Sequence, residues 1–150
     1  MCIRDRAFSY GMWVNPASSL VNVQFAGGMN TDGWTAGAVH FKLSYGLVNA
    51  GINGLDGGDL QGATMVNAGE WSHMALTVAE TRVAIYLNGQ VEDARDLSAP
   101  MTNLVVGGAS LGAWNNGGDL QRGMAGQMDD VRIYDRALSE AEVLFLADHR

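Results

Sequence analysis

Apolar and polar residues alternate with a period of two along several short stretches of the chain. Phe41 and Leu43 alternate with polar neighbours, and Met74, Leu76 and Val78 alternate with His73, Ala75 and Thr77. Successive side chains of a β-strand point to opposite faces, so this period predicts strands with one face on a core and one toward water. Such alternation favours antiparallel over parallel sheets. The predicted strands cover residues 8–14, 21–25, 39–44, 73–78, 83–87, 90–92, 104–106 and 128–134.

Short turn signals separate these strands. Asn88-Gly89 lies between two of them, and this dipeptide is a strong hairpin signal because both residues tolerate positive φ. The chain has 20 glycines and only 2 prolines, and glycine clusters recur between the apolar runs. Many short strands joined by regular turns are typical of a β-sandwich or a jelly roll.

One helix is predicted near the C-terminus. Ser139 and Glu142 have the spacing of a capping box, in which each side chain binds the backbone N–H of the other. Apolar residues then recur at helical spacing, and the helix should pack against the sandwich edge and end near Asp148. The sequence therefore predicts an all-β fold, an antiparallel two-sheet jelly-roll sandwich with one short C-terminal helix.

Composition and charge narrow the functional classes. The 150 residues correspond to one domain, and 47% hydrophobic against 17% charged residues excludes a disordered chain. No apolar run approaches the roughly 20 residues of a transmembrane helix. A net charge of −7 with a single lysine, Lys42, disfavours nucleic-acid binding because such a surface repels phosphates.

The first six residues fit no pattern downstream. Residues 1–6 look like the translated adapter scars found at the ends of metagenome-derived reading frames, so the domain is expected to cover residues 7–150. The single cysteine, Cys2, falls in this segment and is given no role. The alternative is an ordinary N-terminal tail.

Five short motifs follow one another along the chain. They are Phe8 to Pro16 with its tryptophan, Trp71 to Ala75, Tyr86 to Gly89, Gly107-Gly108, and Gly126 to Ser139. Over residues 8 to about 147 the chain thus resembles the laminin-G-like, concanavalin A-like jelly-roll domains. The resemblance implies a binding module with an extracellular or cell-surface location. It also implies that a first strand, which would pair beside Met128 to Tyr134, is missing, leaving that strand as an exposed edge.

The sequence contains no pattern that indicates catalysis. Glucanases of similar fold use a Glu-x-Asp-x-x-Glu strand, which is absent, as are a nucleophile elbow and a phosphate loop. Glu92, Asp93 and Asp96 are interpreted as a solvated strand end. His73 is interpreted as a hydrogen-bonded packing histidine, with a catalytic base as the alternative. Trp13 is interpreted as part of the core or its edge. The prediction is that the protein is not an enzyme.

Candidate ligand-binding residues lie in polar loops. Trp34 follows Asp-Gly, and Trp114 precedes Asn115 and Asn116 in a glycine-rich segment. A loop tryptophan can offer a flat face to a sugar ring while amides bind its hydroxyls. The alternative is that these tryptophans fold back over the end of the sandwich. A second candidate surface consists of polar sheet positions, namely Asn22, Gln24, His40 and Lys42.

Acidic loops raise the question of calcium, which prefers six to eight oxygen ligands. One loop offers Asn53, Asp56 and Asp59, and another offers Asn115, Asn116 and Asp119. The family resemblance implies Asp129 as a metal ligand. The alternative is that these aspartates form Asx-turns or bind nearby backbone.

The leading hypothesis is a non-catalytic carbohydrate-binding or adhesion module of a larger secreted or cell-surface protein. Its partner would be a glycan or polysaccharide, with Ca²⁺ as a possible cofactor. A protein-interaction or spacer domain without a small-molecule site is the alternative, and it predicts that the loop tryptophans are buried. A glycoside hydrolase is the third hypothesis, and it requires paired carboxylates that the sequence lacks.

Overall fold

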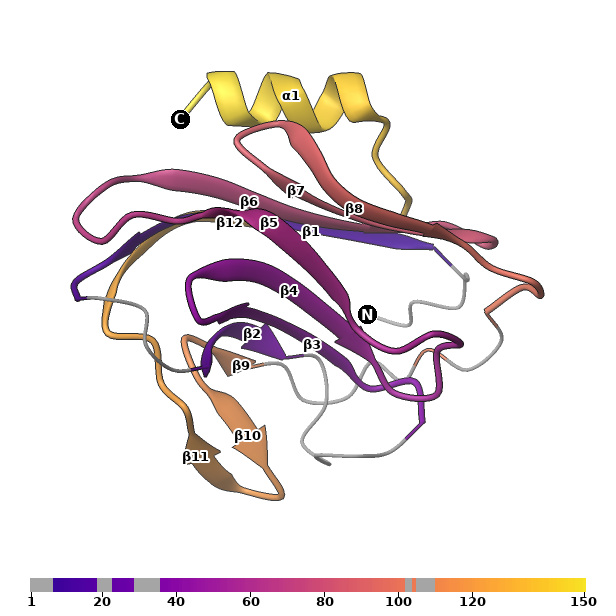
Figure 1. The fold of residues 1–150 in the computed structure, drawn as a ribbon, viewed down its shortest axis with the longest axis horizontal. Helices are drawn as coiled ribbons and strands as arrows, with labels where there is room; N and C mark the ends of the chain where they lie inside the picture. The colour runs from indigo at the N-terminus through magenta and orange to yellow at the C-terminus, as the bar shows by residue number, and fades with distance from the viewer. Residues whose placement is uncertain (1–6, 19–22, 29–35, 102–103, 105–109) are drawn as a thin grey trace.

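Two antiparallel sheets lie face to face in the computed structural model, which describes residues 7–18, 23–28, 36–101, 104 and 110–150 (Figure 1). Sheet 1 has the order β12-β1-β6-β7-β8, and sheet 2 has the order β5-β4-β3-β2-β9. A two-stranded hairpin, β10-β11, lies on the side of sheet 2 away from sheet 1 (Figure 1). The predicted antiparallel jelly-roll sandwich with one C-terminal helix is confirmed.

The strands of sheet 1 are β1 (Phe8–Pro16), β6 (Ser72–Val78), β7 (Arg82–Leu87), β8 (Gln90–Asp96) and β12 (Gly126–Tyr134). Those of sheet 2 are β2 (Val23–Gly28), β3 (Val39–Ser44), β4 (Leu47–Ile52), β5 (Leu60–Met65) and β9 (Ser110–Leu111). The hairpin consists of β10 (Trp114–Asn116) and β11 (Asp119–Gln121), and the helix is α1 (Glu140–Asp148). Sequence analysis did not identify β4 and β5, and the strand expected over residues 104–106 lies mostly outside the described residues.

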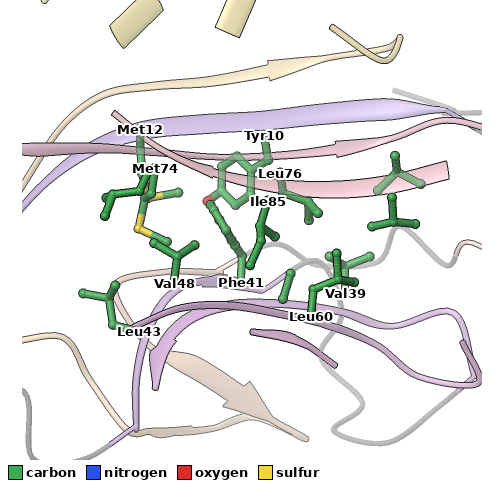
Figure 2. Close-up of a cluster of buried hydrophobic side chains, with 14 of the residues drawn as sticks. Tyr10, Met12, Val39, Phe41, Leu43, Val48, Leu60, Met74, Leu76 and Ile85 are labelled. Carbon is green, nitrogen blue, oxygen red and sulfur yellow. The ribbon is translucent and has the colours of Figure 1, made fainter. Parts of the chain in front are cut away.

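The core forms where the inner faces of the two sheets meet. Phe41 and Leu43 of β3 are fully buried, as are Met74, Leu76 and Ile85 of the opposite sheet (Figure 2). Every second residue of these strands points inward, as the alternation predicted. The ring of Tyr10 packs 5.7 Å from that of Phe41, and burial raises the pKa of its hydroxyl.

The helix α1 lies on the outer face of sheet 1 rather than at the sandwich edge that was expected (Figure 1). Val143 and Leu146 pack on Ala75, Ala84 and Tyr86, which form an apolar patch on that face. The small side chains of the two alanines let the helix approach the sheet closely. The helix therefore covers a surface that would otherwise be exposed and apolar.

The predicted capping box is confirmed. The Glu142 N–H donates to the Ser139 hydroxyl at 3.3 Å, and the Ser139 N–H donates to the Glu142 carboxylate at 2.8 Å. Arg136 donates to both oxygens of the same carboxylate. The Arg136 hydrogen bonds, joined by those from Ser139, lower the pKa of Glu142 to about 2.

Two carboxylates of β8 join the adjacent edges of the two sheets. The Glu92 Oε2 atom accepts hydrogen bonds from the N–H groups of Ala63 at 2.8 Å and Thr64 at 2.9 Å. The Asp93 Oδ2 atom accepts one from the N–H of Gln61 at 3.1 Å. The interpretation of this segment as a solvated strand end is therefore wrong for Glu92 and Asp93, whose side chains bind the backbone of β5, and right for Asp96, which is exposed.

Strand β12 lies at the edge of sheet 1 and pairs with β1. The pairing contains a bulge, at which Asp130 adopts a positive φ of 48°. Among the described residues, no strand pairs with the other edge of β12. No helix in the described part of the chain has the length and apolar character needed to cross a bilayer.

Replacement of Phe41 by alanine should lower the free energy of unfolding by about 3–5 kcal/mol, because it leaves a cavity between the sheets. Urea denaturation measures the change. Phe145→Ala is the matched control, since Phe145 is 59% exposed and should change stability by less than about 1 kcal/mol. Equal losses in the two variants would contradict the assignment of Phe41 to the core.

Replacement of Glu92 by glutamine should destabilise the protein at neutral pH by about 1 kcal/mol. Burial alone would raise the pKa of Glu92, but the hydrogen bonds from Thr64 and Ala63 outweigh it and hold the pKa below its ordinary value of 4.5. The carboxylate thus stabilises the fold above pH 4.5 and loses this contribution as the pH falls further. The difference in unfolding free energy between wild type and variant should shrink as the pH falls below 4.5, and urea titrations at several pH values measure it. A difference that stays constant with pH would contradict the role of the Glu92 carboxylate.

Candidate functional site

The outer face of sheet 2 carries a row of polar side chains. Lys42 of β3 is in register with Asn49 of β4, and Asn49 is in register with Gln61 of β5. Each alternates with a core residue, so the burial of Phe41 and Leu43 places these side chains on the opposite face. Three neighbouring strands therefore present donors and acceptors side by side.

Hydrogen bonds fix this polar row. The Asn49 Nδ2 atom donates to Gln61 Oε1 at 2.7 Å, and the Lys42 ammonium lies 2.8 Å from Asp59 Oδ2. Asn49 is only 4% exposed, and its Oδ1 atom has no hydrogen-bond partner in the described part of the chain. Gly51 leaves room for Asp59, since a Cβ atom there would lie 2.6 Å from the Asp59 Oδ1 atom.

The β10-β11 hairpin adds an aromatic ring and a cation to this face. The ring of Trp114 lies 5.9 Å from that of His40, which itself is 5% exposed. The Arg122 guanidinium, just after β11, lies over the same indole at 5.3 Å from its centroid. We call the combined set the hairpin–sheet site; it comprises His40, Lys42, Asn49, Asp59, Gln61, Trp114 and Arg122.

The environment of His40 favours its neutral form. Burial lowers the pKa of His40 most, the Lys42 and Arg122 charges lower it further, and Asp59 opposes the shift. A neutral imidazole has one donor and one acceptor nitrogen. At neutral pH the site thus combines an imidazole, two amides, two cations and one carboxylate.

The structure corrects the expectation that Trp114 occupies an exposed loop. Trp114 begins strand β10 and is 4% exposed, with His40 and Arg122 against its ring. It offers no open face to a sugar, although it belongs to the hairpin–sheet site. The turn predicted beside it is present: the Asn115 Oδ1 atom accepts a hydrogen bond from the Gly118 N–H at 2.8 Å.

The remaining predicted sugar-binding residues are placed differently. Asn115 and Asn116 are half-buried in β10 at the base of the hairpin turn, and binding by either stays a prediction. Trp34 and Asn22 lie outside the described residues, as does the side chain of Gln24. Sequence reasoning missed Asn49, Asp59 and Gln61 as parts of a sheet surface and Arg122 altogether.

The residue expected to bind calcium, Asp129, lies on the outer face of sheet 1. Its Oδ2 atom is 3.2 Å from the Arg150 guanidinium, and its Oδ1 atom accepts a hydrogen bond from the Asp130 N–H. The Arg150 guanidinium also stacks on Trp71, 3.6 Å from the ring centroid. Among the described residues, no three His, Cys, Asp or Glu side chains gather as metal ligands would. Calcium binding stays a prediction.

His73 packs against Trp13 as the sequence indicated, but its buried Nδ1 atom has no hydrogen-bond partner among the described residues. His73 is 2% exposed, lies 5.5 Å from Trp13 ring to ring, and has its pKa lowered to about 4, mainly by burial. A Cβ atom on Gly11 would lie 3.4 Å from the imidazole, so the glycine leaves space for the ring. A group with so low a pKa is neutral at physiological pH.

A small cavity opens at one end of the sandwich. Residues 36–37, 52–56 and 97–101 enclose about 200 Å³, below the roughly 300–1,000 Å³ typical of ligand pockets. Asp56 lines it and is held by Ser98 Oγ at 3.3 Å. The cavity is thus a weaker candidate than the hairpin–sheet site.

The chain belongs to the concanavalin A-like lectin/glucanases superfamily, whose laminin-G-type model matches residues 2–144. This assignment agrees with the two-sheet jelly roll and with the resemblance noted in the sequence. None of the curated proteins compared with the chain matches it.

Solved structures of similar fold include three informative ones. The CBM40 of the Ruminococcus gnavus IT-sialidase bound to alpha2,3 sialyllactose has a TM-score of 0.80 at 17% identity, covering 97% of this chain and 84% of that one. A SAP-like pentraxin from Limulus polyphemus has a TM-score of 0.73 at 18% identity, covering 95% and 70%. Domain 4 of an extracellular arabinanase from Geobacillus stearothermophilus, in complex with arabinotriose, has a TM-score of 0.70 at 20% identity, covering 95% and 66%. At these identities the similarity shows the fold alone.

Replacement of Gly51 by alanine should displace Asp59 from Lys42 and lower the melting temperature by a few degrees, about 1 kcal/mol. Gly123→Ala is the matched control, because the nearest atom to its Cβ would be 3.7 Å away. Adding Asp59→Ala to the Gly51 variant should remove most of the clash and produce a coupling energy in the double-mutant cycle. Calorimetry that found strictly additive effects would contradict this close contact.

Proposed function

We propose that the protein is a non-catalytic carbohydrate-binding module and that it binds its glycan at the hairpin–sheet site. The observation that carries the proposal is the fixed polar row of Lys42, Asn49 and Gln61 on an outer sheet face, beside a packed tryptophan. Sugar hydroxyls both donate and accept, and this row offers both functions. Gln61 is the exposed amide of the row, and the buried Asn49 side chain holds its Oε1 atom in place.

The chemistry of the site favours binding over hydrolysis. The usual glycosidase mechanism needs two carboxylates facing one glycosidic bond, one as acid and one as base or nucleophile. The hairpin–sheet site contains Asp59 alone, and Lys42 holds that carboxylate at 2.8 Å. The proposal is therefore that the site holds a sugar without cleaving it.

Relatives of the fold add support. Two of the solved structures named above contain a bound oligosaccharide, and the superfamily includes lectins. The arabinanase domain comes from an extracellular enzyme. We infer that this chain likewise acts outside the cell or at its surface, as a targeting unit of a larger protein.

One observation favours a second candidate function, a protein-interaction or spacer domain. That hypothesis predicts buried loop tryptophans, and Trp114 is 4% exposed. The polar row is present in either case, so only a binding measurement separates the two functions.

The proposal predicts that the protein binds glycans on an array and that Gln61→Ala weakens binding about five- to tenfold, as expected for loss of about 1 kcal/mol of hydrogen bonding. Gln127→Ala is the matched control, because Gln127 is also exposed but lies on β12 of the other sheet. Running the array with Ca²⁺ and with a chelator also tests the calcium prediction.

Three results would argue against parts of this proposal. Absence of binding to any glycan would remove the carbohydrate-binding function in favour of the spacer domain. Binding that Gln61→Ala leaves intact would remove the hairpin–sheet site. Turnover of a polysaccharide by the purified protein would remove the non-catalytic assignment.

A further inference from the structure

Arg122 differs from the other described arginines in its partners. Each of the others donates to an oxygen: Arg82 to Asp96, Arg95 to the carbonyls of Asp56 and Gly58, Arg132 to Asp130, Arg136 to Glu142, and Arg150 to Asp129. In the described part of the chain, the Arg122 guanidinium has the Trp114 ring as its contact and no carboxylate or carbonyl partner. Its hydrogen-bond donors are thus available to a ligand.

The backbone at Arg122 is strained in a way that serves this placement. Arg122 has a φ of 50°, in the left-handed region that non-glycine residues rarely adopt. Such strain persists only where surrounding structure compensates for it, and it is concentrated at functional positions. The conformation places the exposed guanidinium over an indole that is itself buried against His40. The Arg122 guanidinium therefore lies over an aromatic ring that is held in place by its burial.

The charge of the hairpin–sheet site is opposite in sign to the net charge of the whole chain. The protein has a net charge of −7, yet the hairpin–sheet site has two cations, Lys42 and Arg122, and a single carboxylate, Asp59. Lys42 lies two residues from His40 on β3, and Arg122 lies over the Trp114 ring that packs against His40. Because Asp59 is bound to Lys42, the uncompensated positive charge belongs to Arg122.

We propose that the hairpin–sheet site selects anionic sugars, and that Arg122 binds the carboxylate of such a sugar. The inference rests on the proposed carbohydrate-binding function and specifies its ligand class. A guanidinium presents parallel N–H donors that match a carboxylate in a bidentate pair, and stacking on an aromatic ring leaves those in-plane donors available. The exposed amide of Gln61 then binds a hydroxyl of the ring, while the buried His40 and Asn49 support the site from below.

Two matched ligand pairs test this assignment by calorimetry. Trigalacturonate is compared with its methyl ester, which keeps the sugar ring and removes the charge, and 3′-sialyllactose is compared with lactose. We expect the wild type to bind at least one acid about tenfold more tightly than its neutral partner. Raising the NaCl concentration should weaken binding of the acid and leave binding of the neutral partner nearly unchanged.

Variants of Arg122 separate charge from geometry. Arg122→Gln keeps a planar group over Trp114 without the charge and should reduce the acid's affinity to that of its neutral partner. Arg122→Lys keeps the charge but not the pair of parallel N–H donors, and should bind the acidic sugar several-fold more weakly than the wild type. The matched control is Arg82→Gln, since Arg82 is an exposed arginine on β7 of the other sheet and should leave binding unchanged.

The results distinguish failure of this inference from failure of the proposed function. Binding of neutral sugars with no preference for the acids would overturn the selection of anions and leave carbohydrate binding intact. Full binding of the acid by Arg122→Gln would overturn the role of Arg122. Absence of binding to every sugar would overturn both. The preference and salt dependence of the wild type decide the inference even if the variants fail to fold.

Discussion

Burial of every second side chain between the two sheets determines where the other side chains lie. Phe41 and Leu43 can reach the core only if Lys42 points the opposite way, and the same holds for each inner strand. A shift of one residue in register would bury the lysine and expose both apolar residues. The hydrophobic contact between the sheets thus fixes the chemistry of both outer faces as well as the fold.

The outer face of sheet 1 is apolar where α1 packs on it, whereas the outer face of sheet 2 carries a polar row. On sheet 1, Ala75, Ala84 and Tyr86 form an apolar surface that α1 covers. On sheet 2 the outward residues Lys42, Asn49 and Gln61 are polar, and Trp114 of the β10-β11 hairpin contacts His40 on the same face. An apolar face without a helix would be an aggregation hazard, whereas a polar face can remain open to a ligand. This difference explains why the candidate site lies on sheet 2.

The sequence predicts what depends on local pattern and fails where long-range packing decides. Alternation located β3 and β6, and the Ser139–Glu142 spacing located α1. Strand β4 was missed because Gly51 and Ala50 give it a weak apolar signal. The Asn-Asn-Gly-Gly segment predicted a turn, but nothing local indicated that Trp114 would fold onto sheet 2. The pairing of Arg122 with that ring arises only from this docking.

The organisation of the site has consequences for how it would bind. Its polar groups are held by one another and by the sheet, so little side-chain freedom remains to be lost when a ligand arrives. Rigidity of sheet 2 is reinforced at β5, whose backbone N–H groups are bound by Glu92 of the other sheet. Arg122 is the exception, since its guanidinium has the Trp114 ring as its contact in the described part of the chain. Stability of the hairpin and selection of charge are therefore coupled: any change that loosens Trp114 from His40 also displaces the cation that faces the ligand.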